Sequence, residues 1–290
     1  MKDYIILTDS SCDLTPALAK EAQVEVIPLQ LTMEGKEYKN YLDGREIDSK
    51  SFYAKLREGI TANTSAVNPD VFTEVFRKVI EDGNDVLYLG FSSGLSTTFN
   101  SARLAAQQLA DKYPERKIIT VDTLAASAGQ GLILKLTLDK QKEGATIEEA
   151  AAFAEDIKFK ISIWFTVDDL VYLKRGGRVS PTAAFFGNML GIKPVLHMDN
   201  EGHLIPLSKV RGRKTSIAAL ADKYGALATK LDSGDIFISH GDCIADAQYL
   251  AELLKTRYGA NVSLITDVGT VIGAHSGPGT LALFFVGKGR

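Results

Sequence analysis

A segment rich in serine and threonine, with two glycines, is the first candidate for chemistry in this sequence. Residues 90–98 read Gly-Phe-Ser-Ser-Gly-Leu-Ser-Thr-Thr, and they separate an apolar run from residues at helical spacing. A strand-to-helix loop of this kind presents free backbone N–H groups and the positive end of a helix dipole, which favour an anion. The hydroxyls add side-chain donors. The simpler interpretation is a helix cap at Ser96 or Thr97, which requires fewer hydroxyls.

A second polar segment has the same character. Residues 60–68 include Thr64 and Ser65, show no hydrophobic periodicity, and precede a helix with Asn68 as its cap and Pro69 at its first position. The first segment follows this helix and one strand directly. We therefore expect the two hydroxyl-rich loops to face one cleft.

The first segment also matches a hydrolase pattern. Gly-Phe-Ser-Ser-Gly at 90–94 fits G-x-S-x-G in the strand-to-helix context that a nucleophile requires. Ser92 would be the nucleophile, and His240 or His275 would be the base. However, helical spacing begins only after the loop has continued three residues past this serine, and no HGG-type oxyanion segment lies upstream. A serine esterase is therefore the alternative function.

One histidine and four arginines are further candidates. His275 stands among four glycines in residues 269–279, where backbone held close to a ligand or to another loop is expected. The arginines form two pairs beside glycines, and guanidinium groups bind phosphate or carboxylates. Solvated surface charge is the alternative, but the pairing favours a docking surface. These arginines are Arg175, Arg178, Arg211 and Arg213.

Other classes of site lack support. No histidine, cysteine and aspartate cluster has metal-ligand spacing, and no Walker A or G-x-G-x-x-G pattern follows a strand. The net charge of -3 gives no electrostatic reason to expect nucleic acid. Cys12 and Cys243 suit a reducing, cytoplasmic setting. No signal pattern or membrane-spanning stretch is found, so we expect no stable membrane insertion. Because metal-ligand spacing and nucleotide motifs are lacking, we also expect no metal and no cofactor.

The elements that must position these residues change character near residue 160. In residues 1–160, strands alternate with helices, which predicts a parallel sheet with helices on both faces. A hairpin is expected at 29–41, with Gly35 at its turn. Residues 123–138 are apolar nearly all round and predict a buried helix. Thr146 and the glutamate three residues later form a capping box.

Residues 161–290 predict an α+β domain. Its expected elements are a strand at 161–167, a short helix ending at Gly176, a helix after Ser180-Pro181 carrying Phe185, Phe186, Met189 and Leu190, a hairpin of 195–198 with 204–210, helices at 215–231 and 245–258, strands at 235–239 and 261–266, and a glycine-rich tail at 268–279. The α/β fold class is therefore a parallel-sheet domain followed by an α+β domain.

Eight motifs in this order resemble those of the DegV family, which includes the fatty-acid-binding subunit of bacterial fatty acid kinase. Two departures from the family pattern are TSAVNP, where TSQP is common, and Thr97, where glycine is frequent. The hydroxyls survive both changes. The motifs are TDSSCDL at 8–14, TSAVNP at 64–69, FSSGLSTTFNSA at 91–102, VDTLAASAGQG at 121–131, DDLVYLKRGGR at 168–178, KPVL at 193–196, RGRK at 211–214 and VIGAHSGPG at 271–279.

The resemblance implies a DegV-like two-domain protein that binds a long-chain fatty acid in a deep apolar tunnel. Thr64 and Ser96 would hold the carboxylate, with Ser65, Ser93 and His275 in support. The arginines of the LKRGGR and RGRK motifs would face a partner kinase. That kinase would transfer phosphate from ATP to the bound carboxylate and form an acyl phosphate. The chain itself would be a carrier rather than an enzyme.

Overall fold

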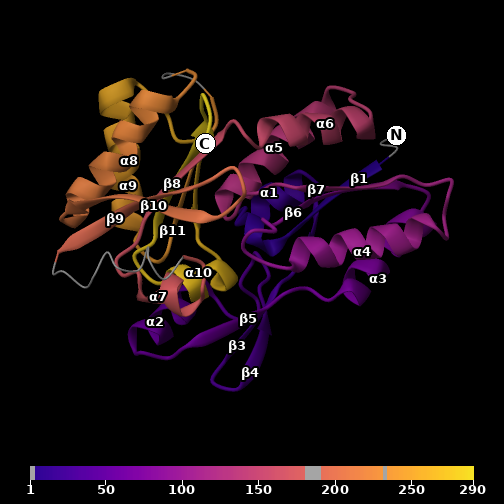
Figure 1. The fold of residues 1–290 in the computed structure, drawn as a ribbon, viewed down its shortest axis with the longest axis horizontal. Coiled ribbons are helices and arrows are strands. Elements are labelled where there is room, and N and C mark those ends of the chain that lie inside the picture. The colour runs from indigo at the N-terminus through magenta and orange to yellow at the C-terminus, as the bar shows by residue number, and fades with distance from the viewer. Residues whose placement is uncertain (1–3, 180–190, 231–233) are drawn as a thin grey trace.

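The structure is a computed structural model that describes residues 4–179, 191–230 and 234–290. Figure 1 shows two halves side by side, each built on its own sheet, with a small third sheet at the base of their junction. No helix in these described ranges combines the length and the apolarity needed to cross a bilayer.

A four-stranded parallel sheet organises the first half. Its strands, in spatial order, are β2 (Glu25–Ile27), β1 (Tyr4–Asp9), β6 (Asp85–Gly90) and β7 (Ile118–Asp122). Helices cover both faces (Figure 1), namely α3 (Pro69–Glu81) and α4 (Thr98–Ala110) on one face, and α5 (Ala128–Lys142) and α6 (Ile147–Ile157) on the other. All three strand pairings are parallel, which confirms the expected parallel sheet. Parallel neighbours need crossover connections, and helices provide them here.

Short sequence motifs determine where α3 and α6 begin, as predicted. The Asn68 carboxamide oxygen accepts from the backbone N–H of Asp70 at 2.9 Å, and Pro69 occupies the first turn of α3. Thr146 and Glu149 make both bonds of the capping box at the start of α6. Caps satisfy backbone donors that a helix leaves unpaired, so these starts depend only on nearby residues.

Helix α5 begins later than the sequence predicted. Residues 123–127 form an irregular loop, in which Leu124 and Ser127 have positive φ, and the helix starts at Ala128. Its residues 128–134 are all buried, because the helix lies between the two halves and contacts β6 as well as three strands of the second sheet. The prediction of a buried helix is thus confirmed, with a corrected start.

A small antiparallel sheet contains the second hydroxyl segment. Its strands, in spatial order, are β4 (Lys36–Lys39), β3 (Gln30–Met33) and β5 (Ala62–Ser65). The hairpin turn at Glu34 and Gly35 is as expected, since both residues have positive φ. The prediction that residues 60–68 form a loop was wrong in part, because 62–65 pair with β3. Sequence periodicity missed β5 because this polar strand is defined by its backbone partner.

A six-stranded mixed sheet organises the second half. Its strands, in spatial order, are β10 (Leu204–Arg211), β9 (Ile192–Met198), β8 (Ile161–Thr166), β13 (Leu281–Val286), β11 (Ile236–His240) and β12 (Leu264–Asp267). Helices α8 (Arg213–Leu227) and α9 (Ile244–Tyr258) cover one face (Figure 1), and α5 contacts the sheet from the other side. The strand β13 was not predicted from the sequence, although it is a central strand.

Two short helices lie where the halves meet. They are α7 (Val171–Arg175) and α10 (Thr270–Ser276), which contact each other. The glycine-rich tail at 268–279, for which no helix was predicted, contains α10. The helix α7 ends at Gly176, as expected, and this residue has a φ of -72°, whereas Gly177 has a φ of +68°. The conformational need for glycine therefore falls one residue later.

The remaining elements complete the description. They are a 3₁₀ turn (Ser10–Cys12), α1 (Pro16–Glu21) and α2 (Ser49–Arg57). The positions of one expected helix lie outside the described residues, namely Ser180, Pro181, Phe185, Phe186, Met189 and Leu190. A domain boundary near residue 160 stays a prediction, because α5 packs against both sheets.

Candidate functional site

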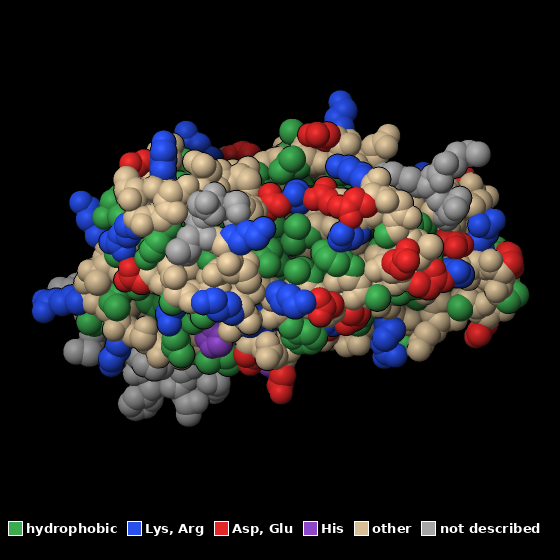
Figure 2. Space-filling view, turned by 90° about the horizontal axis from the view of Figure 1, so that it is seen from above, with side chains coloured by type: hydrophobic (Ala, Val, Ile, Leu, Met, Phe, Trp, Pro, Cys, Tyr) green, Lys and Arg blue, Asp and Glu red, His purple; other side chains and the backbone are tan. Residues whose placement is uncertain are grey.

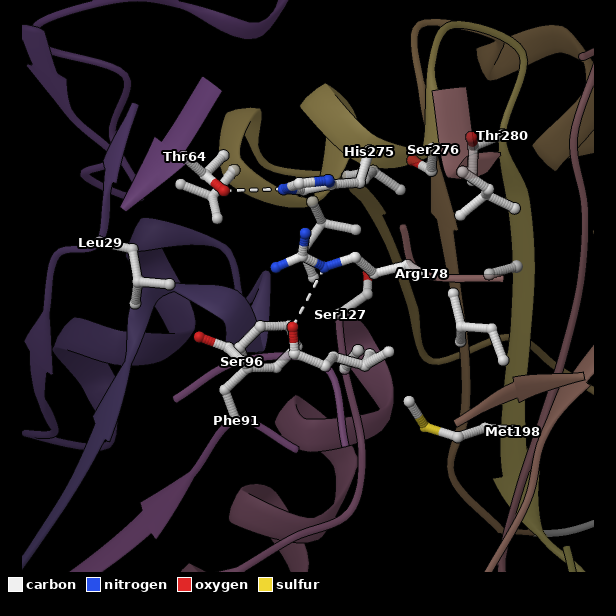
Figure 3. Close-up of a pocket in the computed structure, with 18 of the residues that line it drawn as sticks. Leu29, Thr64, Phe91, Ser96, Ser127, Arg178, Met198, His275, Ser276 and Thr280 are labelled. Carbon is white, nitrogen blue, oxygen red and sulfur yellow. Dashed lines mark hydrogen bonds between the residues drawn. The ribbon is translucent and has the colours of Figure 1, made fainter. Parts of the chain in front are cut away.

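An apolar cavity of about 420 Å³ lies between the two halves of the molecule. This volume falls within the range of roughly 300 to 1,000 Å³ that is typical of small-molecule sites. The six-stranded sheet, β5 of the small sheet, loops of the first half and α10 contribute to its wall (Figure 3). Much of the lining is hydrophobic, including Phe91, Leu95, Ile163, Phe165, Met198 and Phe284.

Polar side chains from four distant segments converge on this cavity. Thr64 comes from β5, Ser96 from the loop before α4, Arg178 from the turn after α7, and His275 from α10. Figure 3 shows the Arg178 guanidinium between the hydroxyls of Thr64 and Ser96 in the view. Ser65 and Ser93 also line the cavity. The structure therefore brings both hydroxyl segments and the candidate histidine to one site.

Thr64 is oriented by His275. The Thr64 Oγ1 and His275 Nε2 atoms are 2.7 Å apart. Burial, together with the positive charge of Arg178, lowers the pKa of His275 to about 4, so the imidazole is neutral at pH 7. Its Nδ1 is buried and has no partner among the described residues. A proton there would be an unsatisfied donor, so the Nε2–H tautomer is favoured and donates to Thr64. The Thr64 hydroxyl proton is then free to point at a ligand.

Ser96 is held by the start of α4. Its Oγ accepts from the backbone N–H of Thr98 at 3.2 Å and lies 2.9 Å from Thr98 Oγ1. Thr98 Oγ1 also accepts from the backbone N–H of Val67 at 3.3 Å. This threonine therefore ties the two hydroxyl segments together. Ser96 both caps the helix and lines the cavity, while the Thr97 side chain makes no capping bond.

Arg178 lies in the cavity, whereas it was expected on a docking surface. Its Nε donates to the carbonyl of Leu95 at 3.2 Å, and Nη1 donates to the carbonyl of Gly176. Burial lowers its pKa, but an arginine remains charged at neutral pH. A positive charge in a largely apolar cavity favours an anionic ligand group. The glycine turn after α7 folds back toward the first half, which the sequence pattern did not reveal.

The other three arginines lie outside the cavity lining. Arg175 lies over the ring of Tyr172, and Arg213 pairs with Asp246 at 2.8 Å. Arg211 ends the edge strand β10 and is exposed. A docking role for these arginines stays a prediction.

Close packing between two glycine-rich motifs holds His275 in place. A Cβ built on Gly176 would lie 2.2 Å from His275 Nδ1, and one on Gly277 would lie 2.3 Å from the ring of Tyr172. Both distances are far below van der Waals contact, so the backbones of α7 and α10 approach only because these side chains are absent. The glycines that suggested a ligand loop in fact bring two helices together around the site.

Comparison with known proteins adds to this geometry. The family model described as "Uncharacterised protein, DegV family" matches residues 4–288. The chain belongs to the DegV family. It is 42% identical over 287 residues to a DegV domain-containing protein of Clostridium perfringens, across 99% of this chain and 98% of that protein.

Solved DegV structures confirm the mixed α/β fold. A DegV lipid-binding protein of Thermotoga maritima is 32% identical, with a TM-score of 0.84 and 100% of both chains covered. A DegV protein of Thermus thermophilus, described by its fatty acid binding, is 31% identical, with a TM-score of 0.86. That comparison covers 98% of this chain and 99% of the Thermus protein.

In this DegV chain, Ser92 does not have the surroundings of a hydrolase nucleophile. The residue is fully buried, and its Oγ donates to the carbonyl of Gly202 at 2.9 Å and accepts from the N–H of Gly94 at 3.2 Å. No histidine bonds to it within the described part of the chain. His275 bonds to Thr64, and His240 Nδ1 lies 3.4 Å from Asp267 Oδ1. The geometry therefore does not support the esterase alternative.

The molecular surface carries both signs of charge. Figure 2 shows Lys and Arg side chains interspersed with Asp and Glu over the face that it presents. That face offers no continuous basic region for a polyanion. The described residues also contain no group of three or more His, Cys, Asp or Glu side chains that would hold a metal ion.

Proposed function

We propose that this protein binds a long-chain fatty acid in the cavity, with the carboxylate held by Thr64 and Ser96 and neutralised by Arg178. The observation that carries this proposal is one cavity that combines a hydrophobic wall with two converging hydroxyls and a guanidinium. A carboxylate accepts several hydrogen bonds and carries one negative charge, so it matches these donors. An alkyl chain matches the hydrophobic wall.

The two parts of the ligand would contribute differently. Burial of an alkyl chain is worth about 0.8 kcal/mol per CH₂, so a long tail supplies on the order of 10 kcal/mol before costs. A hydrogen bond to a charged group contributes only about 1.5–3 kcal/mol. The tail would therefore supply most of the affinity. The hydroxyls and the guanidinium would set the orientation of the carboxylate.

The comparisons support the ligand class. The Thermotoga and Thermus proteins described above are named for binding lipid and fatty acid, and each is more than 30% identical to this chain over almost its whole length. Binding rather than catalysis also agrees with the burial of Ser92, whose hydroxyl donates to the carbonyl of Gly202.

We further propose that the bound fatty acid is presented to a separate ATP-dependent kinase, which forms the acyl phosphate. The sequence contains no Walker A pattern after a strand, so the partner would supply the nucleotide site. This chain would then be a carrier without a cofactor of its own. Arg175, Arg211 and Arg213 are the candidates for docking, and the two free cysteines favour a cytoplasmic setting for the exchange.

Organic extraction of the purified protein followed by mass spectrometry tests the central claim. We expect close to one long-chain acid per protein, or uptake of added fatty acid by protein that is purified empty. A protein that neither carries nor takes up a fatty acid would refute the proposal.

A double variant tests the assignment of the carboxylate. Thr64→Val with Ser96→Ala should weaken binding of a fatty acid more than binding of the matching fatty alcohol. Only the acid has an anionic carboxylate that accepts hydrogen bonds from both hydroxyls. Acyl phosphate formation by an added kinase should fall further than fatty acid binding. Equal losses for acid and alcohol would place the carboxylate elsewhere.

A further inference from the structure

The six-stranded sheet forms an apolar wall of the cavity across from the carboxylate site. Figure 3 shows Thr64 and Met198 on opposite sides of the view, and Met198 belongs to β9 of that sheet. A tail whose carboxylate lies at Thr64 and Ser96 would therefore meet this wall with its far end. The hydrophobic residues of the sheet that line the cavity are Ile163, Phe165, Met198, Leu204, Ala282 and Phe284.

Two of these wall residues also contact helix α5. Ile163 and Phe284 are paired across β8 and β13, so their side chains point to the same face of the sheet. A Cβ built on Gly129 of α5 would lie 2.9 Å from Ile163 Cδ1 and 2.9 Å from Phe284 Cδ1. The same two side chains therefore border Gly129 on one side and the cavity on another.

The backbone of α5 does not itself require glycine at this position. Gly129 lies near the start of the helix, and its φ is outside the left-handed region. Alanine is more favourable than glycine in a helix, so the missing Cβ has to be explained by the neighbours. Protein interiors are close-packed, and a crowded side chain moves toward open space. The open space that Ile163 and Phe284 border is the cavity.

We infer that Gly129 sets the longest acyl tail that the cavity accepts, because it allows Ile163 and Phe284 to lie back against α5. A methyl group at this position pushes one or both side chains into the space for the end of the tail. Gly129 is not among the residues that line the cavity, so it acts through the wall and not through contact with the ligand. This inference rests on the proposed function, since it names a determinant of tail length for the same cavity.

Displacement titrations with saturated acids from decanoic to arachidic acid test the inference. The readout is the Kd of each acid in Gly129→Ala divided by its Kd in the wild-type protein. Each buried CH₂ is worth about fourfold in affinity, so a wall that excludes about two of them weakens binding by about tenfold or more. We expect a ratio of about tenfold for the longest acids that the wild-type protein binds, and of less than about twofold for the shortest acids, which end before the wall.

Gly131→Ala is the matched control. It adds the same methyl group two residues later in α5, where the new Cβ would lie 2.6 Å from the carbonyl oxygen of Cys12 and 2.9 Å from Leu14 Cδ2. Neither Cys12 nor Leu14 lines the cavity. This variant should lose stability in urea unfolding, but the dependence of its affinity on tail length should match that of the wild-type protein.

A second variant changes the wall without crowding it. Phe284→Leu removes part of the ring at the same place and should improve binding of the longest acids relative to the shorter ones. Helix α5 is unaltered in this variant, so its result decides the question if Gly129→Ala does not fold.

The possible outcomes are distinct. The inference is refuted if Gly129→Ala weakens every acid to the same degree, if Gly131→Ala changes the dependence on tail length as much as Gly129→Ala does, or if Phe284→Leu leaves that dependence unchanged. If the wild-type protein binds no acid of the series, the proposed function itself fails.

Discussion

Replacing Gly176 by alanine should disable carboxylate recognition without contacting the ligand. The added Cβ would lie 2.2 Å from His275 Nδ1. An ordinary contact needs roughly 3.4 Å or more, so the imidazole would have to move by about 1 Å. The bond between His275 Nε2 and Thr64 Oγ1, now 2.7 Å, would break or bend. Thr64 would then lose the donor that orients its hydroxyl.

The size of the effect follows from the group that is lost. A hydrogen bond from an oriented hydroxyl to a carboxylate contributes about 1.5–3 kcal/mol. Since about 1.4 kcal/mol corresponds to tenfold in affinity, fatty acid binding should weaken by about tenfold or more. Binding of the matching fatty alcohol should change little, because its affinity comes mainly from the tail.

Gly177→Ala is the matched control. It adds the same methyl group one residue later, where no described atom lies within 4 Å of the new Cβ. Its φ of +68° makes alanine strained, so this variant should lose about 1–2 kcal/mol of stability. It should nevertheless keep the preference of the wild-type protein for acid over alcohol.

Displacement titrations with acid and alcohol, together with urea unfolding, separate the two effects. The reasoning is refuted if Gly176→Ala retains the full preference for the acid while His275 is shown by NMR to have moved. It is also refuted if both glycine variants lose that preference equally.

Three further predictions test other contacts. Arg178→Met should weaken fatty acid binding by about tenfold or more, because a charge-assisted contact is lost. Arg175→Met alters an arginine outside the cavity lining and should not weaken binding. Equal effects of the two variants in displacement titrations would contradict the placement of Arg178. Burial raises the pKa of Asp13 to about 8, whereas an aspartate in the unfolded chain has a pKa of about 3.9. Between these pH values the folded state binds one more proton than the unfolded state. The free energy of unfolding should therefore fall as the pH rises from about 4 to 8. Asp13→Asn should reduce this slope in urea unfolding, and an unchanged slope would show that another group titrates. Arg290 donates to the backbone carbonyls of Thr123, Leu124, Lys158 and Asp199. Arg290→Ala should therefore lower the free energy of unfolding by about 1–3 kcal/mol. An unchanged midpoint of urea unfolding would count against this role.

Features that depend on neighbours a few residues apart could be read from the sequence. The hairpin turn at Glu34 and Gly35, the cap at Asn68 and the capping box at Thr146 all follow from local backbone and side-chain bonds. The alternation of strands and helices likewise determined the parallel sheet. The family resemblance depended on short motifs, and it pointed to the same hydroxyls that the cavity brings together.

Elements that depend on distant partners were beyond such patterns. The strand β5 exists because Thr64 pairs with Leu31, and the pattern of its own residues carries no strand signal. The central strand β13 follows a glycine-rich stretch and is inserted between β8 and β11, which lie far earlier in the chain. Pairing of this kind is selected by the surrounding sheet, so a short window of residues does not specify it.

The sequence by itself determined which groups were available: two clusters of alcohols, a histidine among glycines and pairs of arginines. Only the tertiary structure decided their roles. It turned Arg178 into the cavity and buried Ser92 against Gly202, and it set His275 against Thr64 across 211 positions of the chain. The physical reason is that a side chain's charge and hydrogen bonds act over a few ångströms, and which groups come that close is decided by packing between segments far apart in sequence.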